Sequence, residues 1–373
     1  MLRTIIINKL FSFFCFIALI SSNADASQEV LNELRLDKNI KIEIYASDID
    51  SPRQMTQGDD GRLYVGSRRS GNIFALRDTD NNGVVDSKEL VAENLTFATG
   101  VSFYDGDLYF SEIDKIWKIE NISTQLNDSF SQLPEKELVA DNLPSDKWNG
   151  WKWLQHDHDG NLYTNVGAPC NVCLRDDKRY ASILKLKKGS WSLVARGVRN
   201  SVGFDFHPDS TKLFFTDNGR DWLGDDSPSC ELNRVDTEGQ FFGFPYMHAV
   251  NVYDPEFGNI NPGFDFVEPI AELGAHVAPT GMIFYTGDLF SEFKNNIFIT
   301  LHGSWNRSSK VGYKVIRVIL DKEGNVSKRL DFISGWLKNE KVLGRPAAPF
   351  MLQDGSLLIS DDKANIIYRV TPK

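Results

Sequence analysis

The sequence predicts an all-β protein with the architecture of a six-bladed β-propeller. The composition is rich in aromatic residues (12%) and contains 28 glycines, which favours strands and tight turns. In addition, one unit of a polar turn followed by a short apolar strand recurs along the chain, and internal repeats of this kind indicate repeat architectures. Six copies of the unit are present, at residues 60–65, 105–110, 159–164, 209–215, 295–299 and 354–359.

The repeated unit has the features of a hairpin within a propeller blade. Four copies begin with an Asp-Gly pair, which supplies the positive φ angle of a tight turn, and β-forming residues follow. Successive turns begin 45, 54, 50, 86 and 59 residues apart, which is the size of a four-stranded blade. Two stacked β-sandwiches would not explain six recurrences. We therefore expect residues 27–373 to form one propeller domain.

Two segments lie outside the regular repeat. The early strand candidate at residues 40–45 is expected to join the last blade and close the ring. The longest interval contains an insertion, residues 240–276, which is rich in glycine, proline and aromatic residues. We expect this insertion to cover one face beside the central channel.

The first 26 residues have the pattern of a secretory signal. Arg3 and Lys9 precede and border an apolar run at residues 10–20, and Ala-Asp-Ala at residues 24–26 offers a cleavage site. The run is shorter than the roughly 20 residues that span a bilayer. We expect export to the periplasm or the medium and a mature chain without a membrane span. The formal charge of −10 argues against nucleic acid as a partner.

Three cysteines remain after the signal. In an oxidising compartment Cys170, Cys173 and Cys230 predict one disulfide and one free thiol. A bridge within the Cys170–Cys173 pair and a Cys173–Cys230 bridge both stay open. Leu174 follows the pair where covalent c-type haem requires histidine, so this cofactor is excluded.

Residues 78–89 match the ligand spacing of a twelve-residue calcium loop. Gly83 stands at the sharp turn, and strand candidates flank the loop, which indicates a structural calcium ion and not a helix-loop-helix switch. A polar turn that binds no ion is the alternative. The expected ligands are Asp78, Asp80, Asn82, the carbonyl of Val84, Asp86 and Glu89.

The densest cluster of polar residues lies between Arg196 and Asn233. Its carboxylates, amides and free carbonyls could hold a hard cation against an anionic ligand, and Arg199 with Asn200 could bind the oxygens of that ligand. A solvated blade loop is the alternative.

Four motifs resemble the glucose/sorbosone dehydrogenase family, whose members are soluble quinoprotein-like six-bladed propellers. The resemblance covers nearly the whole mature chain. The motifs are GVRNSVGF at 197–204, FTDNGRDWLGDD at 215–226, LHGSWNRS at 301–308 and GSLLISDD at 355–362.

This resemblance implies a cofactor and a reaction. Members of the family bind pyrroloquinoline quinone (PQQ) over the channel and oxidise the anomeric carbon of an aldose, using a histidine base, Ca²⁺ and an arginine. The substrate would be a sugar or an aldehyde sugar, with an electron acceptor that the sequence does not identify. By resemblance, Arg199 and Asn200 match quinone contacts, Asn218 and the Gly219 and Arg220 carbonyls match the calcium stretch, Arg345 and Asp361 match late-blade contacts, and Asn306 and Arg307 lie near a cofactor-contacting position.

The chain departs from the family where the base is expected. A pair of histidines is replaced by Trp148 and Asn149, and Asn149 has no titratable nitrogen. His276 and His302 are better substitutes than His156 and His158, which are expected to be turn residues. Two alternatives therefore stay open beside the dehydrogenase: a non-catalytic, calcium-stabilised propeller that binds carbohydrate or a protein partner, and a calcium-dependent lactonase.

Overall fold

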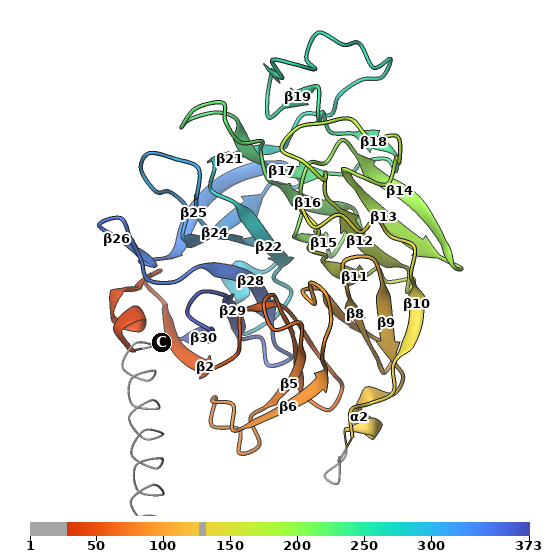
Figure 1. Cartoon of the computed structure of the whole chain (residues 1–373). Helices are drawn as coiled ribbons and strands as arrows, with labels where there is room; N and C mark the ends of the chain where they lie inside the picture. Colours follow the sequence, from red (N-terminus) through yellow and green to blue (C-terminus); the bar gives the residue numbers. More distant parts are fainter. Residues whose placement is uncertain (1–27, 127–131) are drawn as a thin grey trace, which may run out of the picture.

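The computed structural model describes residues 28–126 and 132–373, and these residues form six antiparallel sheets arranged as the blades of a propeller (Figure 1). The predicted fold is thus confirmed. The expected signal segment, residues 1–26, lies outside the described residues.

Each blade contains four strands in up-and-down order. The innermost strands are β3 (Pro52–Gln57), β7 (Val101–Tyr104), β11 (Leu154–His156), β15 (Phe204–Phe206), β22 (Pro279–Phe284) and β28 (Pro346–Met351). The second strands are β4 (Leu63–Ser67), β8 (Asp107–Ser111), β12 (Leu162–Val166), β16 (Leu213–Asp217), β23 (Ile297–Leu301) and β29 (Leu357–Asp361). The third strands are β5 (Ile73–Arg77), β9 (Ile116–Ile119), β13 (Ser182–Lys187), β17 (Ser229–Arg234), β24 (Lys314–Leu320) and β30 (Ile366–Pro372). The outer strands are β6 (Ser87–Ala92), β10 (Glu137–Ala140), β14 (Ser190–Arg196), β21 (Ala271–Ala275), β25 (Val326–Ser334) and β2 (Ile40–Ala46).

A few short elements decorate the blades. They are β1 (Arg35–Leu36), β18 (Gln240–Phe241), β19 (Met247–His248), β20 (Val252–Tyr253), β26 (Leu337–Lys338), β27 (Lys341–Val342), the helix α2 (Ile122–Gln125) and the 3₁₀ turn η1 (Ser291–Phe293). Among the described residues, no helix is long and apolar enough to cross a membrane.

The repeated turns lie where the sequence predicts them, between the innermost and the second strand of each blade. Gly61, Gly106, Gly160 and Gly355 have φ angles of 80°, 84°, 78° and 85°. This left-handed conformation is one that glycine adopts without steric cost. In the two looser copies Thr211 and Asn295 take this role, with φ angles of 57° and 60°.

The ring is closed by a strand from the beginning of the chain. As predicted, β2 pairs antiparallel with β30 and completes the last blade, with Ile42 opposite Val370 and Ile44 opposite Tyr368. The outer edge of the last blade is therefore formed by a strand that precedes the first blade.

The core lies between neighbouring blades. The second strands β4, β12, β16, β23 and β29 are buried along their whole length, because both faces of each sheet pack against other blades. Phe214 and Leu232 of one blade, for example, share a cluster with Met282 and Ile299 of the next. Complete burial of such a side chain contributes about 1.5–3 kcal/mol.

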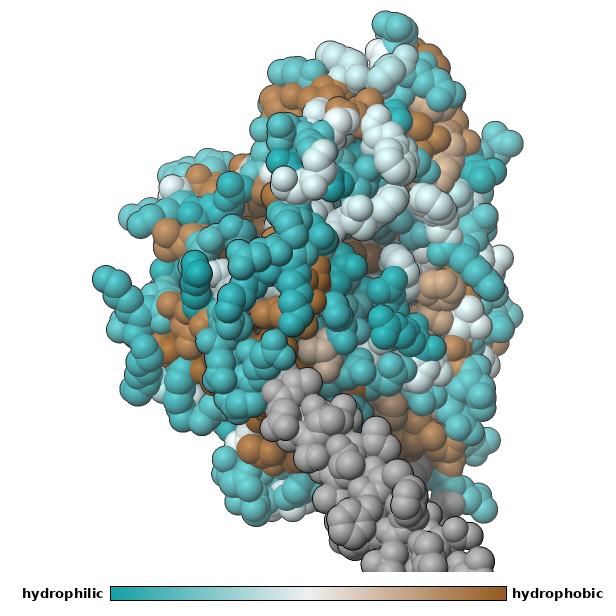
Figure 2. Space-filling model, turned by 60° about the vertical axis from the view of Figure 1, so that its left-hand side comes forward, coloured by the Kyte–Doolittle hydropathy of each residue, from teal (hydrophilic) through white to brown (hydrophobic). Residues whose placement is uncertain are grey.

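The insertion begins at the outer rim of the propeller. Its strand β18 pairs parallel with β14, at the outer edge of the third blade, and the segment around β19 projects from the molecule there (Figure 1). Asp254 of the insertion pairs with Arg220 in the loop after β16, and the last residue of the insertion, His276, lies beside the central channel. Figure 2 shows a mostly hydrophilic surface, with hydrophobic side chains on this projecting lobe, where Tyr253, Ile260 and Phe264 are exposed.

Candidate active site

A cavity of about 560 Å³ opens at one end of the central channel, a volume within the range of ligand pockets. The residues that line it occupy similar positions in the different blades. In each antiparallel hairpin the start of the innermost strand and the end of the second strand lie at the same edge of the sheet. Residues at or before the starts of innermost strands are Arg53, Trp151, Asn200, Val202, Thr280 and Arg345, and residues after second strands are Arg68, Asn218, Gly219 and His302.

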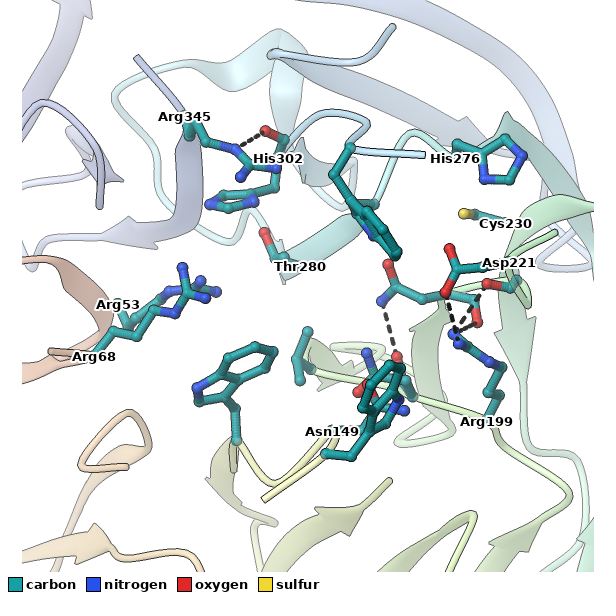
Figure 3. A pocket seen from close by; sticks show the side chains of 18 of the residues that line it. Arg53, Arg68, Asn149, Arg199, Asp221, Cys230, His276, Thr280, His302 and Arg345 are labelled. Atoms are coloured by element: carbon teal, nitrogen blue, oxygen red, sulfur yellow. Dashed lines mark hydrogen bonds and ion pairs between the residues drawn. The ribbon is translucent and has the colours of Figure 1, made fainter. Parts of the chain in front are cut away.

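One side of the cavity is cationic. Figure 3 shows Arg53 and Arg68 side by side, with Arg345 on the neighbouring wall. A single buried carboxylate, Asp362, faces the first two, at 2.7 Å from Arg53 Nη2 and 3.3 Å from Arg68 Nη1. Arg345 donates instead to the carbonyls of His302 and Gly303, at 3.0 and 2.5 Å. This wall therefore carries more positive than negative charge.

Asp362 also orients His302. The Nε2 atom of His302 lies 2.8 Å from Asp362 Oδ1, and both side chains are buried. Burial alone would raise the pKa of Asp362, but Arg53, His302 and Arg68 outweigh it and hold the pKa below its usual range. The carboxylate is therefore ionised and accepts the Nε2 proton.

The imidazole of His302 is neutral at ordinary pH. Burial lowers its pKa to about 4, although Asp362 acts in the opposite direction. Because Nε2 carries the proton, Nδ1 is a free acceptor, and no hydrogen bond to Nδ1 is found within the described part of the chain. His302 lines the cavity, so this side chain has the form of a general base.

Arg199 lies in the opposite wall of the cavity (Figure 3). Its guanidinium donates to Asn171 O at 2.9 Å, Asn171 Oδ1 at 3.0 Å and Asp221 Oδ2 at 3.2 Å. It also donates to the carbonyls of Asn218 and Gly219, at 3.2 and 3.0 Å. The donors of Arg199 are thus engaged by the wall itself.

Three further predicted cofactor residues line the same cavity: Asn200, Asn218 and Gly219. The Asn218 amide donates to the carbonyls of Asn200 and Pro279, at 2.8 and 3.0 Å. The carbonyl of Gly219, predicted to face calcium, accepts from Arg199. The structure therefore brings together Arg199, Asn200, Asn218, Gly219 and Arg345.

Four predicted residues do not line the cavity. Arg220 turns toward the insertion and pairs with Asp254. Arg307 is bonded to Asp225 and Asp226 on the rim, and Asn306 lies 3.4 Å from Asp221 Oδ1. Asp361 is fully buried behind the wall, where it accepts the backbone N–H of Arg345 at 2.8 Å.

Asn149 lines the cavity but has a structural bond. Its φ angle is 53°, a left-handed conformation in which asparagine is enriched. The side-chain Nδ2 donates to the Ala168 carbonyl at 2.9 Å, which fixes the segment after β12. Trp148, beside it, is 52% exposed at the cavity mouth.

Several polar atoms in the cavity wall are buried without a hydrogen-bond partner. Among the described residues, Arg53 Nε, Trp151 Nε1 and Asn200 Oδ1 are in this state. Buried polar atoms are almost always paired, so unpaired ones gathered around one cavity indicate a site completed by a ligand or by water.

The calcium loop forms between β5 and β6. The carboxylates of Asp78, Asp80 and Asp86 each place an oxygen within 4.8 Å of the others, and Asp78 also accepts the N–H of Gly83 at 2.8 Å. Glu89 does not join this group, since its carboxylate lies 3.9 Å from Arg62 Nε. The structure thus assembles three of the predicted carboxylate ligands.

The cysteines and remaining histidines take defined places. Cys170 and Cys173 form the disulfide, and Cys230 is free and buried in the cavity wall. His276 also lines the cavity and lies 2.8 Å from the Gly224 carbonyl. His156 is the last residue of β11 and not a turn residue as predicted. It is stacked on Tyr104 and lines a separate pocket, so it is not placed to act as a base in this cavity.

Sequence reasoning missed Arg53, Arg68 and Asp362. Arg53 and Arg68 lie outside the four family motifs, whereas Asp362 is the last residue of one of them, next to the predicted contact Asp361. The available signal was positional: Arg53 stands at the start of an innermost strand, and Arg68 and Asp362 follow second strands. Applying this rule to all predicted blades would have identified them.

Solved structures with the same fold include proteins named as sugar dehydrogenases. The PQQ domain of pyranose dehydrogenase from Coprinopsis cinerea superposes with a TM-score of 0.75 at 17% identity, covering 91% of this chain and 97% of that one. A family AA12 carbohydrate-active enzyme of Trichoderma reesei superposes with a TM-score of 0.76 at 17% identity, covering 91% of this chain and 98% of that one. For the PQQ-bound aldose sugar dehydrogenase of Streptomyces coelicolor, the TM-score is 0.65 and the identity 16%, and the match covers 91% of this chain and 100% of that one. These likenesses show the fold, a six-bladed β-propeller, which is the fold that the sequence motifs predict.

Within this fold the chain belongs to a defined family. Residues 26–301 match the model described as domain of unknown function DUF7133, so the protein is a member of that family. Residues 263–350 also match a model described as TrAA12-like. An uncharacterized protein of Borreliella burgdorferi is 36% identical over 376 residues, which cover 98% of this chain and 97% of the relative.

Proposed function

We propose that the protein is an exported, PQQ-dependent dehydrogenase that oxidises the anomeric carbon of an aldose or a related sugar. The observation that carries this proposal is the cavity in which Arg53, Arg68 and Arg345 converge with a neutral, carboxylate-oriented His302. The fold that it shares with enzymes named as PQQ-dependent sugar dehydrogenases supports the same conclusion.

The cavity fits an anionic, planar cofactor. PQQ carries three carboxylates, and arginine binds carboxylates in bidentate geometry. Arg53, Arg68 and Arg345 would hold these groups, and the unpaired Asn200 Oδ1 and Trp151 Nε1 atoms supply further polar partners. Bound PQQ would supply a two-electron oxidant that accepts a hydrogen with its electron pair.

His302 would act on the substrate hydroxyl. Nδ1 of His302 would accept the proton of the C1 hydroxyl, and this proton transfer would assist loss of the C1 hydrogen as hydride, so that the product is a lactone. Asp362 stabilises the imidazolium that forms, in the way a buried carboxylate does in other dyads. His302 thereby replaces the base that the resemblance places at Asn149.

The pocket does not fit a calcium ion at the position the resemblance implies. The Gly219 carbonyl already accepts a hydrogen bond from Arg199, and a guanidinium at this carbonyl would repel Ca²⁺. We therefore assign the local positive charge to Arg199. A structural calcium ion in the loop of Asp78, Asp80 and Asp86 remains part of the proposal.

A titration with PQQ tests the cofactor assignment. Purified protein is titrated while the visible spectrum is recorded, and reduction of an acceptor dye is then followed with a panel of aldoses. We expect tight binding by the wild type, a loss of roughly tenfold or more in affinity in Arg53→Gln or Arg345→Gln, and no change in the exposed control Arg329→Gln. Uptake of PQQ without dye reduction by any aldose would favour a non-catalytic carbohydrate-binding propeller, which the exposed Trp148 at the mouth would suit.

A further inference from the structure

Two tryptophans at the edge of the cavity are unusually exposed. Trp222 and Trp305 are 66% and 64% exposed, the highest values among the large hydrophobic residues that the structure describes. Their ring centroids lie 5.7 Å apart and the rings are almost perpendicular, at 87°. Because Trp305 also lines the cavity, the pair extends the cavity wall outward into solvent.

The two loops that carry these rings are fastened to each other. Arg307 donates to the Asp225 carbonyl and, at 2.9 Å, to Asp226 Oδ1. The Ser308 N–H donates to Asp225 Oδ1 at 3.1 Å. These bonds join the segment after Trp305 to the segment after Trp222, so the relative position of the two rings is set before any ligand binds. Such preorganisation lowers the entropic cost of binding.

Trp222 also has a costly backbone conformation. Its φ angle is 69°, in the left-handed region where a bulky residue is an outlier. Strain of this kind destabilises the folded chain and is concentrated at functional sites. A glycine would relieve it, yet the chain places its largest side chain there and exposes it to water.

The chemistry around the two rings suits a neutral sugar. The faces of indole rings pack against the apolar C–H face of a pyranose, while neighbouring polar groups bond its hydroxyls. Asp225, Asp226 and Asn306 flank the tryptophans in sequence, and the Asp226 side chain is 89% exposed. These carboxylates accept hydroxyl hydrogen bonds and would repel an anionic ligand.

We propose that Trp305 and Trp222 form an outer subsite that binds the second and later sugars of a neutral oligosaccharide whose terminal sugar enters the cavity. The preferred substrate is then an oligosaccharide with a free anomeric end, which would bind more tightly than a free monosaccharide. The oxidation of that end rests on the proposed function, whereas binding at the subsite does not require PQQ.

Calorimetric titration of the protein without PQQ tests the subsite directly. The probes are glucose, cellotriose and maltotriose. We expect at least one trisaccharide to bind roughly tenfold or more tightly than glucose, since its second and third sugars would bury apolar surface against the two indole rings. Trp305→Ala and Trp222→Gly should lose this advantage, and Trp222→Gly should fold at least as stably as the wild type because it relieves the strained φ angle. Tyr253→Ala, which removes an equally exposed aromatic ring (58%) from the insertion, should keep it.

The outcomes separate this inference from the proposed function. If both trisaccharides bind no better than glucose, or if both tryptophan variants keep the advantage, the subsite is refuted whatever the enzyme oxidises. If the trisaccharides bind through the tryptophans but the protein takes up no PQQ, the subsite stands and the dehydrogenase fails.

Discussion

The imidazole Nε2 of His302 lies 2.8 Å from the carboxylate of Asp362, and both groups are buried at the wall of one cavity. His302 follows β23 in the fifth blade, and Asp362 follows β29 in the sixth. The carboxylate thus fixes, from a neighbouring blade, which nitrogen of the imidazole carries the proton. The proposed chemistry depends on this relationship.

Replacing His302 should abolish turnover without abolishing cofactor binding. In His302→Gln, the proton acceptor is lost, and kcat of PQQ-loaded protein should fall by about 10²–10⁴-fold. Dye-reduction kinetics measure the loss, and the spectrum of bound PQQ shows that the cofactor site is intact. Unchanged kcat in a variant that still binds PQQ would exclude His302 as the base.

As the pH is lowered, kcat should begin to fall only at an unusually acidic pH. Because burial lowers the pKa of His302 to about 4, the base is unprotonated at higher pH, and kcat should stay level from near pH 8 down to roughly pH 5 before it falls. A solvent-exposed histidine would lose activity near its ordinary pKa of about 6.5. Steady-state rates across this range, at saturating sugar, distinguish the two cases.

Placing histidine at position 149 should not increase turnover. Asn149→His removes the hydrogen bond to the Ala168 carbonyl and should destabilise the protein by about 1 kcal/mol, while His302 already supplies a base. Thermal unfolding and dye reduction are measured on the same preparation. A rise in kcat would show instead that position 149 is the place of a lost base.

Glu231→Gln should stabilise the protein at alkaline pH. Burial, and secondarily Asp217, raises the pKa of Glu231, so the folded state binds a proton that the unfolded state releases above about pH 4.3. Stability is complete below that value and is lost as the pH rises through the folded pKa. Neutral glutamine removes this loss, and its amide oxygen can still accept a hydrogen bond from the Ala249 N–H, which donates to Glu231 at 2.7 Å.

The Glu231→Gln effect is measured by denaturant unfolding at pH 5 and pH 8. We expect the variant to gain about 1–2 kcal/mol over the wild type at pH 8 and to show the smaller difference between the two conditions. Equal pH dependence in both proteins would contradict a protonated Glu231.

Calcium should raise the unfolding temperature through the β5–β6 loop. A ligand that binds only the folded state at 100 times its Kd adds about 2.7 kcal/mol. Asp80→Asn should abolish the increase, because Asp80 belongs to the carboxylate group, whereas Asp159→Asn in another Asp-Gly turn should retain it. A calcium effect that survives Asp80→Asn would place the ion elsewhere.

The fold was predictable because its repeats are local. An Asp-Gly turn and the apolar strand behind it are visible within six residues, and their recurrence fixes the number of blades. The attachment of the insertion to the outer edge of the third blade could not be predicted, because the parallel pairing of β18 with β14 uses backbone hydrogen bonds and leaves no pattern of side chains in the sequence.

The sequence motifs predicted several residues of the candidate site, but the ion pairs that connect distant segments could not be predicted. Arg199, Asn200 and Arg345 lie at the cavity as expected, but the partners Arg53 and Asp362 come from opposite ends of the chain. The resemblance predicts a cofactor contact at Asp361 and not at the neighbouring Asp362. Because side chains alternate along an extended chain, Asp361 points into the blade and Asp362 faces His302. Which of two adjacent carboxylates faces the cavity depends on strand register.

Because β2 and β30 close the ring, one wall of the cavity can form only late in folding. Arg53 and Arg68 belong to the first blade and Asp362 to the last, so their ion pairs cross the seam at which the two ends of the chain meet. Contacts of such large sequence separation are slow to form, and the seam is complete only when the final strand has docked. An anionic ligand that binds these arginines together with Arg345 would bridge the first and last blades. The rate at which these two blades separate should therefore fall as more of the protein binds the ligand.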